Sequence, residues 1–181
     1  MKSVLISIRP KWTEKIASGQ KTIEVRKTAP KEVPFKCYIY ETQGQYIKFI
    51  HGAHTKYGYG CGKVIGEFIC DKVERLEEHI EQGGLYYILS DTFNEQAQLD
   101  NWELHDYGKG KTLYGWHISD LTLYDKPKEL SEFCIPCKVS CENCKNPLYF
   151  ECWCEEKGKK IVTRPPQSWC YVEDLGEEEC R

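Results

Sequence analysis

Apolar and polar residues alternate along much of the chain, and this alternation predicts strands. Val4, Ile6 and Ile8 share one face of a strand over residues 3–8. Further strands are predicted, from alternation and β-branched or aromatic content, over residues 20–26, 36–42, 63–73, 112–124 and 168–173. Because the strands follow one another irregularly with few short helices between them, we expect an α+β fold, a small mixed β-barrel and not a doubly wound parallel sheet.

Three helices are predicted among these strands, over residues 10–18, 74–82 and 93–104. Pro10 suits the first turn of the first helix, and Gly19 ends it. Glutamate content favours the second helix, and Thr92 and Glu95 have capping-box spacing before the third. The many glycines of residues 44–62 instead predict a mobile loop.

The segment 19–26, Gly-Gln-Lys-Thr-Ile-Glu-Val-Arg, concentrates polar chemistry on one predicted strand. Thr22, Glu24 and Arg26 share a face, while the apolar residues between them point to the other. Alternate residues of a strand lie about 7 Å apart, so a hydroxyl, a carboxylate and a guanidinium stand side by side. Lys21 has the opposite parity and can join them only from the less regular start of the strand.

Size and charge narrow the class of protein. A chain of 181 residues with 40% hydrophobic content suits one packed domain with an elaboration. The apolar run after Met1 is too short for a secretory signal, and no segment reaches about 18 apolar residues, so we expect a cytoplasmic protein without a membrane span. Residues 1–63 carry 12 basic and 4 acidic side chains, whereas residues 64–105 carry 2 and 10, which predicts one anion-attracting face unless the two blocks neutralise each other.

Eleven cysteines form the second strong signal. Six of them fall in two C-x-x-C pairs and a C-x-C within 21 residues, a pattern typical of a structural Zn²⁺ site. We predict zinc ligation by Cys134, Cys137, Cys141 and Cys144, with Cys152 and Cys154 as alternatives. The segment has few apolar residues, so metal would replace a missing core. A disulfide framework is the alternative, but a reducing compartment disfavours it.

The octapeptide resembles the G-x-K-x-x-E-x-R signature of the ASCH domain family, a relative of the PUA-like folds. Gly19, Lys21, Glu24 and Arg26 fill all four positions. The resemblance extends to the residues that precede it and to two later strand-like segments, namely 6–12, 62–68 and 116–118. We therefore assign a PUA-like barrel to residues 1–133 plus 165–181, and a Cys-rich metal-binding insertion to residues 134–164.

The resemblance implies a cleft beside the first helix that holds RNA or a modified nucleotide. The residues themselves fit this chemistry, because cations contact phosphate or base edges and a carboxylate accepts from an amino group. The expected ligand-binding residues are Arg9, Trp12, Lys21, Thr22, Glu24 and Arg26. The expected stacking surfaces for an unpaired base are Trp12, Tyr57, Tyr59 and Trp116. A purely structural ion pair between Glu24 and Arg26 is the alternative.

Two other functions remain open. Some small ASCH-like proteins are amidohydrolases that deacetylate acetylcytidine, and Lys21 and Thr22 match their Lys-Thr pair. Glu24, however, stands where those enzymes carry a catalytic threonine, so an enzyme acting on modified nucleosides or RNA would rely on Lys21 and Glu24. The other possibility is that the Cys-rich insertion recruits a protein or nucleic-acid partner.

Overall fold

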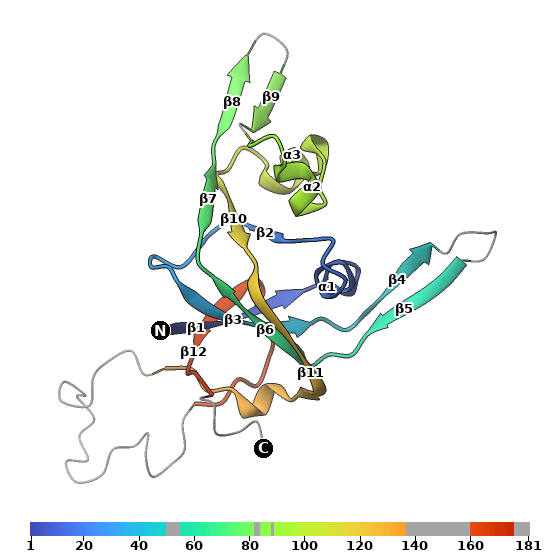
Figure 1. Cartoon of the computed structure of the whole chain (residues 1–181), viewed down its shortest axis with the longest axis vertical. Helices are drawn as coiled ribbons and strands as arrows, with labels where there is room; N and C mark the ends of the chain where they lie inside the picture. Colours follow the sequence, from blue (N-terminus) through green and yellow to red (C-terminus); the bar gives the residue numbers. More distant parts are fainter. Residues whose placement is uncertain (50–54, 82–83, 88, 137–159, 176–181) are drawn as a thin grey trace, which may run out of the picture.

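The structure, a computed structural model, describes residues 1–49, 55–81, 84–87, 89–136 and 160–175. Strands dominate it, and the helices are short (Figure 1). In chain order the elements are β1 (Lys2–Ile8), α1 (Pro10–Ala17), β2 (Ile23–Arg26), β3 (Phe35–Glu41), β4 (Gly44–Phe49), β5 (Thr55–Gly60), β6 (Val64–Cys70), β7 (Val73–Leu76), β8 (Glu78–Glu81), β9 (Gly84–Tyr87), α2 (Phe93–Ala97), α3 (Asn101–Gly108), β10 (Leu113–His117), β11 (Ser119–Lys128), the 3-10 helix η1 (Leu130–Glu132) and β12 (Trp169–Val172).

The largest sheet has the strand order β11-β6-β3-β1-β12. Its central pair, β1 and β3, is parallel, and α1 lies in the connection between them; the other pairs are antiparallel. All residues of β1 after Lys2 are buried. A strand buried on both faces is expected at the centre of a covered sheet, which explains its nearly continuous apolar sequence.

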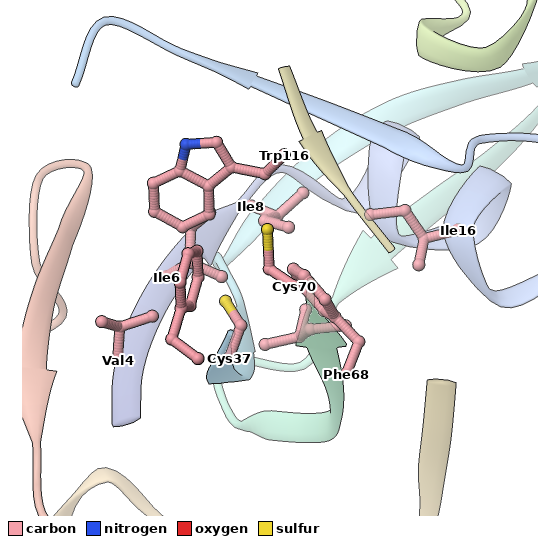
Figure 2. Close-up of a cluster of buried hydrophobic side chains, with 10 residues drawn as sticks. Val4, Ile6, Ile8, Ile16, Cys37, Phe68, Cys70 and Trp116 are labelled. Carbon is pink, nitrogen blue, oxygen red and sulfur yellow. The ribbon is translucent and has the colours of Figure 1, made fainter. Parts of the chain in front are cut away.

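A second sheet, with the order β2-β10-β7, lies against the first. Only Ile118 separates β10 from β11, so one length of chain contributes to both sheets. The main core cluster combines buried side chains from β1, α1, β3, β6 and β10, as Figure 2 shows. Trp116 of β10 has no exposed surface, and its ring packs edge-on against Phe35 (5.1 Å between centroids) and Trp169 (5.7 Å). Trp116 therefore ties the sheet that carries β2 to the five-stranded sheet.

The described strands do not close into a barrel, which corrects that part of the sequence-based prediction. The pairing leaves β11 and β12 at the edges of one sheet and β2 and β7 at the edges of the other. Closure requires a continuous ladder around the sheet. Here the ladder is interrupted where β6 passes into β7 and where β10 passes into β11. Side chains of both sheets meet in the main core cluster instead. The prediction of a strand-dominated α+β fold is confirmed.

Two sequence-based predictions of secondary structure are wrong. The predicted loop 44–62 contains the β4–β5 hairpin, and the predicted helix 74–82 overlaps β7 and contains β8. In the first case Gly58 faces the ring of Tyr46 across the hairpin, so this glycine serves strand packing and not mobility. In the second case β7 pairs with β10 and buries Leu76 in the second core cluster. Long-range pairing thus overrides the helix preference of a glutamate-rich segment.

The predicted helix 93–104 is two helices, α2 and α3. Thr92 makes no side-chain capping bond. The capping box lies further along the chain, where the carboxylate of Asp100 accepts from the backbone N–H of Glu103 (2.7 Å) and the Glu103 carboxylate accepts from the N–H of Asp100 (3.0 Å). Gln98 has a left-handed backbone (φ 55°) that ends α2 and redirects the chain into α3.

Near its C-terminus the chain rejoins the five-stranded sheet. β12 pairs with β1, and an isolated bridge joins Cys134 to Ile161 on either side of residues 137–159, which lie outside the described part of the chain. The boundaries of the Cys-rich insertion therefore stay a prediction. In the described residues, no helix has the length and apolar character needed to span a bilayer.

The burial of Trp116 predicts a large loss of stability on truncation. Trp116→Ala should lower the free energy of unfolding by about 3–5 kcal/mol, because it removes a fully buried indole between the two sheets. Trp102→Ala is the matched control: the same deletion at a side chain that is 73% exposed should change stability by no more than about 0.5 kcal/mol. Urea denaturation monitored by far-ultraviolet circular dichroism measures both. Equal losses in the two variants would contradict the assigned role of Trp116.

Candidate functional site

The end of α1 sets the position of Lys21. Gly19 adopts a left-handed backbone (φ 74°), and its N–H bonds to the carbonyl of Ile16 (2.9 Å), which terminates the helix. Two residues later the N–H of Lys21 bonds to the carbonyl of Lys15 (3.0 Å). Lys21 therefore lies before β2 and does not follow the alternation of side chains along that strand. For this reason its side chain can lie on the same face as that of Glu24.

Lys21, Glu24 and Arg26 form a buried ionic cluster. Their exposed fractions are 2%, 5% and 8%. The Lys21 Nζ lies 3.5 Å from Glu24 Oε2, and an Arg26 Nη lies 2.9 Å from Glu24 Oε1. One carboxylate is thus held between two cations, and a fixed orientation of Glu24 follows.

Backbone carbonyls anchor both cations from other elements. Lys21 Nζ donates to the carbonyl of Ala97 at the end of α2 (2.5 Å), and Arg26 donates to the carbonyl of Ser7 in β1 (2.7 Å). The Nε of Arg26 is buried and has no hydrogen-bond partner among the described residues. Buried donors are normally paired, so this N–H is an exception that the described contacts do not explain.

Burial also changes the acidity of Lys21. Desolvation lowers the pKa of its ammonium below the ordinary 10.5, and the nearby Glu24 carboxylate opposes this shift only in part. A buried amine with a lowered pKa loses its proton more readily than a surface lysine. Lys21 can therefore serve as a hydrogen-bond donor in one protonation state and as a base in the other.

The cluster borders a cavity of about 770 Å³ that lies between the α1–β2 region and α3. Its residues come from β1, α1, β2 and α3, from the connections α1–β2, β3–β4 and α2–α3, and from the loop before β12. They are Ser7, Ile8, Arg9, Trp12, Lys21, Glu24, Val25, Arg26, Thr42, Leu99, Trp102, Glu103, Asp106, Tyr107, Pro165, Pro166, Gln167 and Ser168. The loop is tied to β1 by Ser7, whose hydroxyl donates to the Pro166 carbonyl (2.6 Å) and whose N–H donates to the Ser168 carbonyl (2.9 Å). The loop before β12 thus completes the cavity wall.

The two sides of the cavity differ in charge. Arg9 and the ionic cluster line one side, whereas α3 contributes the carboxylates of Glu103 and Asp106 to the other. Asp106 pairs with Lys109 (3.2 Å), and Glu103 belongs to the capping box. The cavity is therefore of mixed charge and not uniformly basic, which suits a ligand that both donates and accepts hydrogen bonds.

Aromatic rings stand on both sides as well. The ring of Trp12 has three lysine ammonium groups near it, those of Lys11 (4.4 Å), Lys21 (5.1 Å) and Lys15 (5.4 Å). On the facing helix α3, Trp102 is among the most exposed large side chains described. Tyr107 also lines the cavity, and burial raises the pKa of its hydroxyl.

The structure brings together most of the side chains that the sequence singles out. Five of the six expected ligand-binding residues line the cavity; they are Arg9, Trp12, Lys21, Glu24 and Arg26. Thr22 is exposed and does not line the cavity, because its position before β2 turns it outward. Of the other expected stacking surfaces, Trp116 is a core residue, and Tyr57 and Tyr59 lie on the β4–β5 hairpin. Ligand binding by these residues itself stays a prediction.

Sequence reasoning missed the contribution of α3. Trp102 lies two residues after the capping residue Asp100, and a tryptophan in the first turn of a helix is a signal that could have identified it. That Trp102 lines the same cavity as Glu24 depends on the packing of α2 and α3 near β2, which no local pattern encodes.

The predicted zinc site lies largely outside the described residues. Cys137, Cys141, Cys144 and the alternatives Cys152 and Cys154 all fall within residues 137–159. Cys134 is described as a partly buried free thiol, and the described part of the chain contains no cluster of three or more potential metal ligands. Zinc binding stays a prediction.

The fold is similar to crystal structures of an ASCH protein from Zymomonas mobilis. One of these structures aligns with a TM-score of 0.52 and 17% identity, over 96% of this chain and 89% of that chain. A mutant of it aligns with a TM-score of 0.53 and 16% identity, over 96% and 92% of the two chains. No family profile and no curated protein matches the sequence. At this identity the likeness concerns the fold, and it confirms the ASCH-type fold predicted from residues 19–26.

The lowered pKa of Lys21 predicts a specific pH dependence of stability. Between the folded-state pKa and 10.5 the unfolded chain binds more protons at Lys21 than the folded chain, so the free energy of unfolding rises with pH in this window. Lys21→Met removes this contribution. The difference in stability between wild type and Lys21→Met should therefore shift in favour of wild type as the pH approaches 10.5. Urea denaturation at several pH values above about 8 measures it, and a constant difference would contradict the lowered pKa.

Proposed function

We propose that the protein binds single-stranded RNA, or a modified nucleotide within it, with one base held in the cavity. The observation that carries this proposal is the buried cluster of Lys21, Glu24 and Arg26, which presents a fixed carboxylate and cationic donors at a cavity that the exposed Trp102 also lines. Sequence-specific recognition of RNA targets unpaired bases through their edges and ring faces.

The mixed charge of the cavity favours a base over a phosphate. A base edge offers donors and acceptors together, so Glu24 would accept from an amino group while the Arg26 guanidinium would donate to a carbonyl or ring nitrogen. A phosphate in the same place would meet Glu24 and also the carboxylates of Glu103 and Asp106. Arg9, at the start of α1, is the cation better placed for the backbone of the bound strand.

Stacking would supply much of the affinity. Trp12 and Trp102 line the cavity from α1 and α3, and base–aromatic stacking contributes about 1–3 kcal/mol per base. Because Trp102 is highly exposed, it would gain the most from covering by a ligand. The similar fold of the Zymomonas mobilis ASCH protein is compatible with this proposal, but the proposal rests on the cavity itself.

For the C-terminal region we propose that residues 134–164 form an insertion stabilised by zinc. Both of its ends lie together: the N–H of Ile135 bonds to the carbonyl of Lys160 (2.8 Å), and the N–H of Val162 bonds to the carbonyl of Phe133 (2.8 Å). A segment that leaves and returns at one place can fold around its own metal without disturbing the sheets. Such an insertion offers a site for a protein partner.

The stacking role of Trp102 is directly testable. Trp102→Ala should weaken the binding of a single-stranded RNA trinucleotide by about five- to hundredfold, since one base loses its stacking surface. Leu123→Ala is the control, because Leu123 is also exposed but lies on β11 and does not line the cavity. Isothermal titration calorimetry measures both affinities. Unchanged binding in Trp102→Ala would overturn the proposed role of the cavity.

A second function, hydrolysis of a modified nucleoside or RNA, is favoured by one observation. Burial lowers the pKa of Lys21, and a neutral amine at a cavity wall can remove a proton from water or from a substrate hydroxyl. Glu24 would then orient the amine and stabilise its protonated form (3.5 Å). This chemistry uses the same cavity as binding.

Catalysis predicts turnover that depends on the amine of Lys21. Lys21→Met should abolish release of acetate from acetylcytidine, or cleavage of a single-stranded RNA, even at substrate concentrations that saturate the variant. Lys15→Met is the matched control: the Lys15 ammonium also lies near Trp12, but it bonds to Gln98 (2.9 Å) and does not line the cavity. Product analysis by liquid chromatography distinguishes the two variants. If wild type shows no turnover, the catalytic proposal is wrong and only the binding proposal remains.

A further inference from the structure

Helix α3 contributes one patch of side chains to the cavity wall. The patch consists of Trp102, Glu103, Asp106 and Tyr107. Residues three and four positions apart lie on the same face of a helix, so these four side chains are neighbours. A ligand in the cavity would meet α3 through this patch.

Two of the three oxygen-bearing side chains in the patch already have partners. The carboxylate of Glu103 accepts from the backbone N–H of Asp100 in the capping box (3.0 Å), and the carboxylate of Asp106 accepts from Lys109 (3.2 Å). The hydroxyl of Tyr107 makes no hydrogen bond to the described part of the chain. It is therefore the oxygen of this patch that can bond to a ligand without giving up a contact within the described residues.

The ring of Tyr107 is attached to the strand that carries the ionic cluster. The ammonium of Lys27 lies 5.0 Å from the centroid of this ring, a cation–π contact. Lys27 directly follows Arg26, the last residue of β2. The contact thus joins α3 to the strand of Glu24 and Arg26, and it restricts the position of the Tyr107 ring at the cavity wall.

The charges of the cluster act on the Tyr107 hydroxyl. Burial raises the pKa of this group, Arg26 lowers it and Glu24 raises it. Because burial has the largest effect, the hydroxyl keeps its proton at neutral pH and can both donate and accept a hydrogen bond. It adds a third hydrogen-bonding group to a wall that already presents the Glu24 carboxylate and the Arg26 guanidinium.

A third contact would separate two bases that the cluster alone treats alike. Adenine and cytosine both place an amino group next to a ring nitrogen, so Glu24 and Arg26 would meet the same pair of groups in either base. On one side of this pair cytosine has a carbonyl where adenine has a C–H. On the other side adenine has a second ring nitrogen where cytosine has a C–H. In either placement only one of the two bases can accept from the hydroxyl.

We propose that Tyr107 is a specificity-determining residue of the cavity, whose hydroxyl bonds to the edge of the bound base and distinguishes adenine from cytosine. This inference rests on the proposed function. It assigns the choice between the two bases to α3, whereas the ionic cluster selects for an amino group beside an acceptor.

Tyr107→Phe tests the hydroxyl alone, because it keeps the ring over which Lys27 lies. Two single-stranded RNA trinucleotides serve as probes, one of adenosines and one of cytidines. The variant should bind one of them about two- to tenfold more weakly than wild type and bind the other unchanged, as expected when one base loses a hydrogen bond. Isothermal titration calorimetry measures the four affinities.

Tyr59→Phe is the matched control. It deletes the hydroxyl of a tyrosine that is 72% exposed on β5 and does not line the cavity, so it should change neither affinity. Tyr107→Phe should also leave the urea midpoint of unfolding unchanged, since its hydroxyl makes no hydrogen bond to the described residues. A lowered midpoint with an equal loss of affinity for both trinucleotides would mean that Tyr107 supports the fold of α3, and the specificity proposal would be overturned.

Trp102→Ala separates this inference from the proposed function. Stacking on an aromatic ring tolerates any base, so its loss should weaken binding of both trinucleotides. If Trp102→Ala weakens both while Tyr107→Phe changes neither, the specificity proposal is wrong and the binding proposal stands. If wild type binds neither trinucleotide, both proposals are overturned.

Discussion

A buried carboxylate must be compensated, and the way Glu24 is compensated organises this part of the molecule. An isolated charge in a protein interior costs several kcal/mol even after relaxation. Lys21 and Arg26 offset that cost, but each of them is buried too and takes a backbone carbonyl from another element, Ala97 of α2 or Ser7 of β1. The carboxylate therefore helps to fix β2 relative to β1 of the five-stranded sheet and to the end of α2. Apolar side chains would hold the same elements at lower electrostatic cost, so a cluster at the wall of a cavity favours a role in recognition.

The sequence predicts this cluster well because its information is local. Alternation along residues 23–26 assigns Glu24 and Arg26 to one face, and Gly19 marks the helix end that lets Lys21 depart from the alternation. The same local logic identified β1, α1 and β3 within a residue or two. It failed for Thr22, because the irregular backbone that brings Lys21 inward turns its neighbour outward.

What the sequence does not predict depends on contacts between distant segments. The carboxylates and aromatic rings of α3 reach the cavity because α2 and α3 pack near β2, and a helix pattern does not say what it packs against. Residues 73–76 are rich in charge, yet they form a strand because β10 offers a partner. The glycines of the β4–β5 hairpin resemble those of a loop until the ring of Tyr46 is seen to lie across Gly58. In each case a non-local partner decides between two structures that the local sequence allows.

The mixed charge of the cavity bears on the kind of ligand that it would suit. Its lining combines the carboxylates of Glu24, Glu103 and Asp106 with the cations of Arg9, Lys21 and Arg26. A purely basic lining would attract any phosphate and would carry no sequence information, whereas paired donors and acceptors match the edge of a base. Because Glu24 is held between two buried cations, its orientation is fixed without a ligand, and a ligand that used it would meet a site that needs little ordering. A cluster of this kind is therefore better suited to selecting one base than to holding the backbone of a strand.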